Sequence, residues 1–231
     1  MYKEYGIDQS LGVDPHVDVH TDYGSVTLAY RHESNGYFTA LDGRYSQGDA
    51  NYKSASGAFN NIPDKEGEVR LRTGADMVMW HGHLLPYIGV GSRMFYDKFK
   101  DIGPGGYDRH ITQFYAPIGT SYRFTDGDWI FTPNIEFDFL IWGQVNSHLG
   151  TLGDPNLPNI TNTQNHGIGG RSEFMVGRQF GDFTLEAGPF MRYWHVDESS
   201  VKPVLGSTPG TGFGEPKNAR LQYGGALRVT Y

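Results

Sequence analysis

Two short stretches of the chain combine side chains that could do chemistry. His16, Asp18 and His20 alternate along the segment DPHVDVHTD, so an extended backbone would present them on one face. Imidazole and carboxylate groups at this spacing could hold Zn²⁺ or another divalent cation. A polar strand face or loop gives the same pattern. These three residues are therefore weak metal candidates, and we expect no metal and no other cofactor.

His195 and Asp197 form the second stretch, WHVDE, near the end of an alternating segment. A histidine beside a carboxylate could polarise a water molecule as a general base. No second acidic pair and no clear serine–histidine pair is evident at a matching position. We assign no catalytic residue, favour a protein without enzymatic activity and keep a hydrolase as an alternative.

Arginines and carboxylates recur at alternate positions along much of the chain. Guanidinium groups pair well with carboxylates, so in a narrow interior they would form a cross-linked polar core. The same arginines could instead line a narrow, ion-selective pore; we favour the salt-bridged core, and both remain open. The residues expected to face this interior are Asp42, Arg44, Arg70, Arg72, Asp76, Arg93, Arg123, Glu136, Asp138, Arg171, Glu173, Glu186, Arg192 and Arg228.

The elements that must position these charges are long strands. From Trp129 to Trp142 nearly every second residue is apolar, while Glu136 and Asp138 fall on the other face. A helix would mix the two sets, whereas a strand separates them. The same alternation predicts nine strands and a weaker tenth, at about 23–33, 36–48, 66–80, 84–97, 109–124, 128–146, 166–180, 182–198, 218–231 and 2–12.

The connections between these strands alternate between short and long. Short turns on one side and long loops on the other are typical of outer-membrane barrels, in which the short turns are periplasmic. We predict one domain, residues 1–231, that forms an all-β, antiparallel, up-and-down transmembrane β-barrel of ten strands, with eight as the alternative. The long loops are rich in Gly, Pro, Asn and Ser and lie at about 49–65, 98–108, 147–165 and 199–217.

The composition excludes several other classes. The 231 residues contain 32 glycines and no cysteine, and the formal net charge is −7. This balance argues against nucleic-acid binding, and no run approaches the roughly 20 apolar residues of a membrane helix. A soluble barrel or sandwich would give the same alternation, but strand length, glycine content and loop asymmetry favour the membrane.

The four tryptophans predict where the membrane surfaces lie. Trp80 and Trp129 stand beside short turns, whereas Trp142 and Trp194 stand near long loops. At about 3.3 Å per residue and about 45° of tilt, the stretch from Trp129 to Trp142 spans about 30 Å, close to a hydrocarbon core. We expect these four side chains to form two aromatic girdles.

The last twelve residues, RLQYGGALRVTY, resemble the terminal strand of Gram-negative outer-membrane proteins, which usually ends in Phe where this chain has Tyr231. The segments LPYIGVG, PIGTSYRF and PNIEFD are similar to a loosely described family of small, porin-like bacterial outer-membrane barrels. The resemblance covers most of the chain. It implies the fold and a bacterial outer-membrane location, as a mature form without signal peptide, but no defined activity.

These observations predict a small porin-like channel or a structural membrane protein with a salt-bridged polar lumen. The expected partners are outer-membrane lipids and, for a channel, small solutes or ions. One alternative is an outer-membrane hydrolase, either a lipid-modifying enzyme or a protease resembling the omptins, which are ten-stranded barrels with an Asp pair and a His–Asp pair near the outer rim. The other alternative is a surface adhesion or binding protein that uses the long loops.

Overall fold

The computed structural model describes residues 2–5, 17–54, 57–98, 100, 107–152, 158–202 and 212–231. These residues form a single antiparallel sheet and include a 3₁₀ turn, η3 (Leu149–Leu152). No helix among them has the length and apolar character needed to cross a membrane. The all-β, antiparallel class predicted from the alternation is therefore confirmed.

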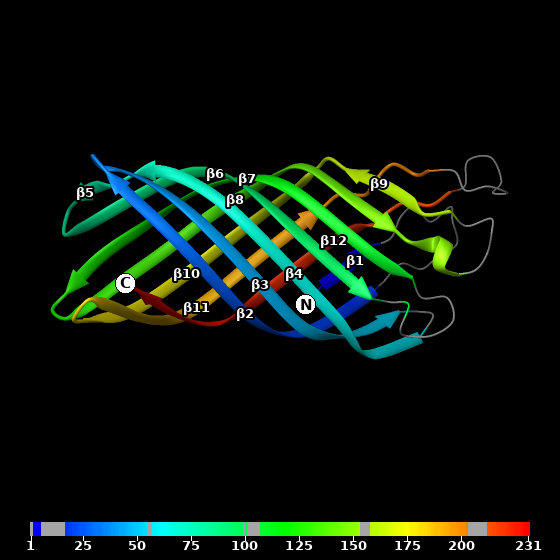
Figure 1. Cartoon of the computed structure of the whole chain (residues 1–231), viewed down its shortest axis with the longest axis horizontal. Coiled ribbons are helices and arrows are strands. Elements are labelled where there is room, and N and C mark those ends of the chain that lie inside the picture. The colour runs from blue at the N-terminus through cyan, green and yellow to red at the C-terminus, as the bar shows by residue number, and fades with distance from the viewer. Residues whose placement is uncertain are drawn as a thin grey trace.

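The strands run at a steep tilt to the long axis of the molecule (Figure 1). Most are far longer than the five or six residues usual in globular proteins. In chain order they are β1 (Tyr2–Tyr5), β2 (Val17–Ser34), β3 (Tyr37–Ser54), β4 (Gly57–Ala75), β5 (Met77–Met79), β6 (Gly82–Lys98), β7 (Asp108–Asp126), β8 (Trp129–Ser147), β9 (Ile160–Gln164), β10 (Gly167–Phe180), β11 (Phe183–Val196) and β12 (Lys217–Thr230).

The sheet is strongly curled, as in a barrel, and its pairings follow the chain. Each long strand pairs with the next along the sequence, from β2 to β8 and from β10 to β12, and β5 continues the edge of β4 beside β6. β8 also pairs with β10 over most of the length of β10, and with β9 at the loop end. The inner side of this curled wall is called the lumen below.

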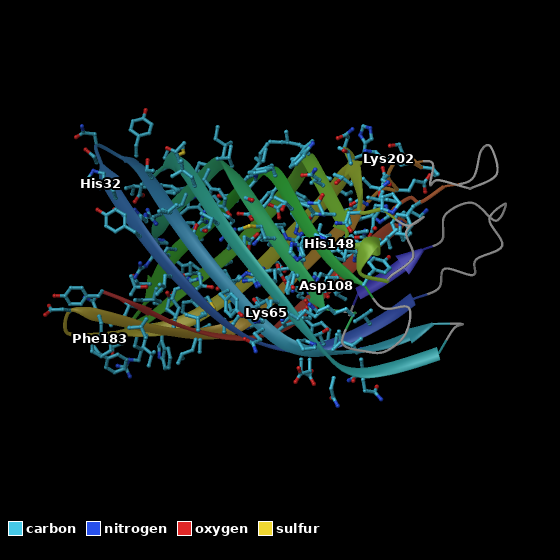
Figure 2. The ribbon with its side chains drawn as sticks, turned by 45° about the vertical axis from the view of Figure 1, so that its right-hand side comes forward. His32, Lys65, Asp108, His148, Phe183 and Lys202 are labelled. Atoms are coloured by element: carbon cyan, nitrogen blue, oxygen red, sulfur yellow. The ribbon has the colours of Figure 1, made fainter. Side chains whose placement is uncertain are left out.

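The two ends of the molecule differ in their connections. At one end, tight hairpins join the strands, and the residues with positive φ include Asn35 and Gly36 between β2 and β3, Gly127 between β7 and β8, and Gly181 between β10 and β11. Asn-Gly is the preferred pair for such a turn, because both central residues need φ > 0. At the other end lie the long connections and β9; Figure 2 places Phe183 at the short-turn end and His148 and Lys202 at the loop end.

Side chains on the outer face form an apolar band. Val90 of β6 is 57% exposed and Phe137 of β8 is 57% exposed, and most other strands contribute similar residues. Toward the loop end the pattern reverses, because Ile62, Phe95 and Ile111 are buried on the inner face. The wall is therefore apolar outside along the band and apolar inside beyond it.

One joint in the wall is much shorter than the others. Within the described residues, β1 pairs with the first residues of β2 and with Lys217–Arg220 of β12, and four residues of β1 connect these two strands there. Along the rest of their length, β2 is paired only with β3 and β12 only with β11, among the pairings of the described residues. We call this region the seam.

The strand predictions need one correction, and one of them is only partly described. The nine predicted strands are present, and several extend further toward the loop end. The tenth, predicted over about 2–12, is described only over β1, and residues 6–16 lie outside the described part. β9 was not predicted; it lies within the expected 147–165 loop, where alternate burial of Ile160, Asn162 and Gln164 fixes it against β8.

Candidate functional site

Arg171 lies at the centre of the lumen and is bound by carboxylates from two other strands. Its Nε is 2.9 Å from both Asp138 Oδ2 and Glu136 Oε1. Its Nη1 donates to Glu68 at 2.9 Å, and Nη2 donates to the Tyr115 hydroxyl at 2.9 Å. Every nitrogen of this buried guanidinium thus has a polar partner.

Glu68 and its neighbour Glu66 link this centre to the next strand. Arg44 Nε donates to Glu68 at 3.2 Å, and Arg44 also pairs with Glu66. Gln222 of β12 donates to the second oxygen of Glu66 at 2.7 Å. The central network, as we call it, consists of Asp42, Arg44, Glu66, Glu68, Arg70, Arg72, Glu136, Asp138 and Arg171.

The short-turn side of this network is closed by further pairs and an apolar layer. Arg72 grips Asp42 with two hydrogen bonds of 2.8 and 2.9 Å, and Arg70 donates to Glu136 at 2.8 Å. Below them, Tyr87 packs with Phe38, Ala40 and Leu85. Tyr87 also donates to Glu136 at 2.9 Å, so the apolar layer and the ionic layer are joined.

Glycines make room for the aromatic rings in this interior. A Cβ on Gly91 would lie 2.3 Å from Cζ of Tyr115, and a Cβ on Gly119 would lie 2.6 Å from the ring of Tyr87. Tyr115 is 0% exposed, as is Asp138, and Glu136 and Glu66 are each 1% exposed. Side chains therefore occupy most of the middle of the lumen, and a small cavity remains beside Thr27 and Arg192.

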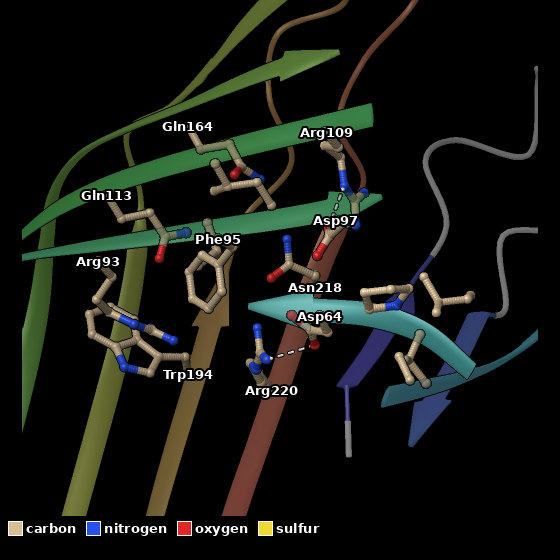
Figure 3. Close-up of a pocket in the computed structure, with 16 residues that line it drawn as sticks. Asp64, Arg93, Phe95, Asp97, Arg109, Gln113, Gln164, Trp194, Asn218 and Arg220 are labelled. Carbon is tan, nitrogen blue, oxygen red and sulfur yellow. Dashed lines mark hydrogen bonds and ion pairs between the residues drawn. The ribbon is translucent and has the colours of Figure 1, made fainter. Parts of the chain in front are cut away.

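The loop end of the lumen holds a pocket with a different lining (Figure 3). The space between its walls, including the part open to solvent, is about 680 Å³. We call it the loop-end pocket. Its apolar wall consists of Val19, Ile62, Phe95, Ile111, Trp194 and Val196, and its polar groups include Asp64, Arg93, Asp97, Arg109, Gln113, Gln164, Asn218 and Arg220.

An acidic pair stands at the mouth of this pocket, beyond the outer apolar band. Asp64 lies directly opposite Asp97 in the β4–β6 register, five residues before Val69, the first exposed apolar side chain of β4. Burial raises the pKa of Asp64 to about 8, and the negative charges of Asp97 and Glu66 act in the same direction. Arg220 lies 3.2 Å from Asp64, and Arg109 lies 3.1 Å from Asp97.

Twelve of the fourteen predicted interior charges take part in an ion pair within the described residues. Some of these pairs lie near the short turns: Arg228 pairs with Glu173 and Glu186, and Asp76 lies 2.6 Å from His83. The two others, Arg123 and Arg192, have no ion pair with the residues that the structure describes; the Arg192 guanidinium lies 4.6 Å from the ring centre of Phe190.

One predicted girdle residue is in the wrong place. Trp194 is 4% exposed and faces the loop-end pocket, where its ring lies 5.1 Å from that of Tyr115. Because Trp194 is two residues from Arg192, strand alternation puts both on the inner face. The other three fit the outer face: Trp80 is 82% and Trp129 49% exposed, and the ring of Trp142 lies 5.8 Å from that of the exposed Phe114.

His195, the candidate general base, does not face the acidic pair in the lumen. His195 Nε2 lies 3.3 Å from Asp197, but Trp194 and Val196 beside it are buried, so His195 faces away from the lumen and from Asp64 and Asp97. An omptin-like site would combine a His–Asp pair with an Asp pair. Here the His195–Asp197 pair and the Asp64–Asp97 pair lie on opposite sides of the wall.

The metal candidates are only partly described. His16 lies outside the described residues, as does the side chain of Asp18, and His20 is exposed on β2. Within the part of the chain that the structure describes, no three His, Cys, Asp or Glu side chains gather as a metal site.

Sequence reasoning missed several residues of the lumen. Glu66 and Glu68 share the parity of Arg70, so continuing the alternation backwards from that residue would have found them. Asp64 shares this parity too, Asp97 shares that of Arg93 and Arg109 that of Arg123, but all three lie where apolar residues also switch to the inner face, so the contrast between an apolar and a charged face is lost there. No known protein family and no curated protein matches this chain.

Proposed function

We propose that this protein is a ten-stranded transmembrane β-barrel of a bacterial outer membrane, with a structural role rather than that of an open channel. The single observation that carries the structural role is the filled lumen. The central network and the apolar layer around Phe38 and Leu85 leave the middle of the interior buried, with Asp138 and Tyr115 at 0% exposure.

Closure of the wall is supported by the pairings. In the order β1, β2, β3, β4, β6, β7, β8, β10, β11 and β12, each strand pairs with the next and β12 pairs with β1, which supports a ring of ten strands around the lumen. Small barrels of about eight strands are just filled by side chains, whereas porins of 16–18 strands enclose a channel. A barrel of ten strands is closer in size to the filled eight-stranded barrels than to the open porins.

The membrane setting is supported by the reversal of polarity along the strands. Within the band, large apolar side chains such as Val90 and Phe137 face outward and ionic pairs face inward, as in a wall surrounded by lipid. Beyond the band, Ile62 and Phe95 turn inward while Lys65 and His110 face outward. The outer face is therefore apolar within the band, as expected in lipid, and polar beyond it, as expected in water.

Single-channel recording tests the structural role. Folded protein, purified in detergent and inserted into a planar lipid bilayer, should give no stable current steps. The double variant Glu68→Ala/Arg171→Ala should conduct, because it removes both partners at the centre of the plug. Stable, voltage-tolerant steps from the unmodified protein would show a channel instead.

A matched control separates the lumen from the rest of the molecule. Asp128 and Arg178 form an exposed ion pair at the short-turn end, with side chains 77% and 43% exposed. The double variant Asp128→Ala/Arg178→Ala removes the same kinds of charge outside the lumen and should stay silent. Equal conductance from both double variants would indicate damaged barrels rather than an opened plug.

A further inference from the structure

We propose that the loop-end pocket binds a small carboxylate with a compact apolar body, and that Arg93 is the residue that receives its carboxylate. The proposal goes beyond the structural role given above and does not depend on it, because the pocket opens at the loop end whether or not the lumen conducts.

Arg93 is a buried cation whose hydrogen-bonding capacity is unused. It is 2% exposed, and its Nε has no hydrogen-bond partner. Within the described residues it donates no hydrogen bond at all; its closest carboxylate oxygen, on Glu66, is 3.6 Å away. That oxygen already pairs with Arg44, and the other oxygen of Glu66 accepts from Gln222. A buried guanidinium normally has carboxylate or other acceptors around its donors.

A second unused polar group stands directly beside it. Gln113 lies opposite Arg93 in the β6–β7 register, is 4% exposed, and its Oε1 has no hydrogen-bond partner. A primary amide can present either its oxygen or its NH₂ group by rotation. With the NH₂ group turned inward, Gln113 and Arg93 offer converging donors, and the planar fork of arginine matches a carboxylate better than a spherical anion.

Aromatic and aliphatic walls surround these donors. The Arg93 guanidinium lies 4.4 Å from the ring centre of Trp194 and 4.7 Å from that of Phe95, which fixes its plane. Ile111 and Val196 complete the apolar lining, at 9% and 1% exposure. A site with apolar walls and a few convergent polar groups is the usual form of a small-molecule pocket. Strongly hydrated anions such as phosphate would lose their water here with little compensation.

The acidic pair at the mouth does not oppose this ligand. Asp64 and Asp97 are each beside an arginine, at 3.2 Å from Arg220 and 3.1 Å from Arg109. The mouth therefore carries no net negative charge, while Arg93, deeper in the pocket, has a distant and shared partner.

Calorimetric titration of the folded protein in detergent tests the proposal, with benzoate as the probe and benzyl alcohol and benzylamine as neutral and cationic controls. Benzoate should bind, and the two controls should bind at least tenfold more weakly. Charge-assisted hydrogen bonds are worth about 1.5–3 kcal/mol, so Arg93→Gln should weaken benzoate binding by about 10–100-fold. Trp194 provides a second readout, because a ligand in the pocket should change its fluorescence.

Arg123→Gln is the matched control variant. Arg123 is on β7, ten residues beyond Gln113 and toward the short turns, and has no ion pair within the described residues; its loss should leave benzoate binding unchanged. Val196→Trp fills the pocket without changing any charge and should abolish binding even if Arg93→Gln fails to fold. Equal binding of benzyl alcohol, preference for benzylamine, or no binding of benzoate to folded protein would each overturn the proposal.

Discussion

The centre of the lumen and the loop-end pocket use the same residue type in opposite ways. Arg171 in the centre has a carboxylate or hydroxyl partner for every nitrogen. Arg93 in the pocket is equally buried but donates no hydrogen bond within the described residues. The difference teaches that burial of an arginine does not define its role: where its donors are used it holds strands together, and where they are unused it leaves a place for a ligand.

The largest effect is expected at the centre. Arg171→Met leaves Glu68, Glu136 and Asp138 buried with one cation fewer, and breaking a buried ion pair on one side costs about 3–5 kcal/mol. Urea unfolding in detergent, followed by tryptophan fluorescence, measures this loss. Arg178→Met, at the exposed pair with Asp128, is the control and should cost less than about 1 kcal/mol. Similar losses for both variants would contradict a special role of the central network.

A pH-dependent effect is expected at the mouth of the pocket. The pKa of Asp64 is raised from 3.8 to about 8, so the folded state keeps this proton after the unfolded state has lost it. The contribution of Asp64 to stability is therefore complete below about pH 4 and is lost as the pH rises toward 8, by at most about 1.4 kcal/mol per pH unit.

Asp64→Asn removes this dependence, because an amide does not titrate. The free energies of unfolding of the wild type and the variant, measured by urea titration at pH 5 and pH 8.5, should diverge in favour of the variant at the higher pH. Parallel behaviour of the two proteins across this range would show that Asp64 ionises normally.

The smallest effect is expected at Arg93. Arg93→Met puts an unbranched apolar side chain between the same two aromatic rings, and Glu66 keeps its pairs with Arg44 and Gln222. Because the nearest carboxylate keeps both of its other partners, we expect a change within about 1 kcal/mol, well below the roughly 3–5 kcal/mol for breaking a buried pair on one side. The same urea assay checks it. If Arg93→Met lowered the free energy of unfolding as much as Arg171→Met, the two arginines would not differ in their structural role.

The fold could be predicted because alternation and turn residues are local signals. Glu136 and Asp138 alternate with exposed aromatic residues along β8, and Asn35-Gly36 marks a tight hairpin by its own backbone preference. Most of the central network followed from the same parity, since the inner face of a strand is fixed once its outer face is known. The pairings among those charges were expected from residue type alone.

The loop-end pocket could not be predicted in this way. Its walls are residues such as Ile62 and Phe95, which lie on the inner face just where the outer face turns polar, so a rule that places apolar residues outside assigns them wrongly. Trp194 was misplaced because its position near a long loop was weighed above its parity with Arg192, which puts it on the inner face. Parity also changes within β8, where a bulge opposite Phe114 and Tyr115 makes Ile141 an extra residue and puts Val145 on the inner face.

The short joint at β1 has a consequence for how the wall forms and opens. Bringing β12 beside β1 closes a loop of more than 200 residues, and the entropy lost in closing a loop increases with its length. In return, the described part of the joint gains a ladder of three residue pairs with β2 and four with β12. We therefore expect this closure to form last during assembly and to open first in the folded protein. Backbone amides near Tyr2–Tyr5 should accordingly exchange their hydrogens with solvent far sooner than those between β8 and β10, where the ladder runs through eleven residue pairs.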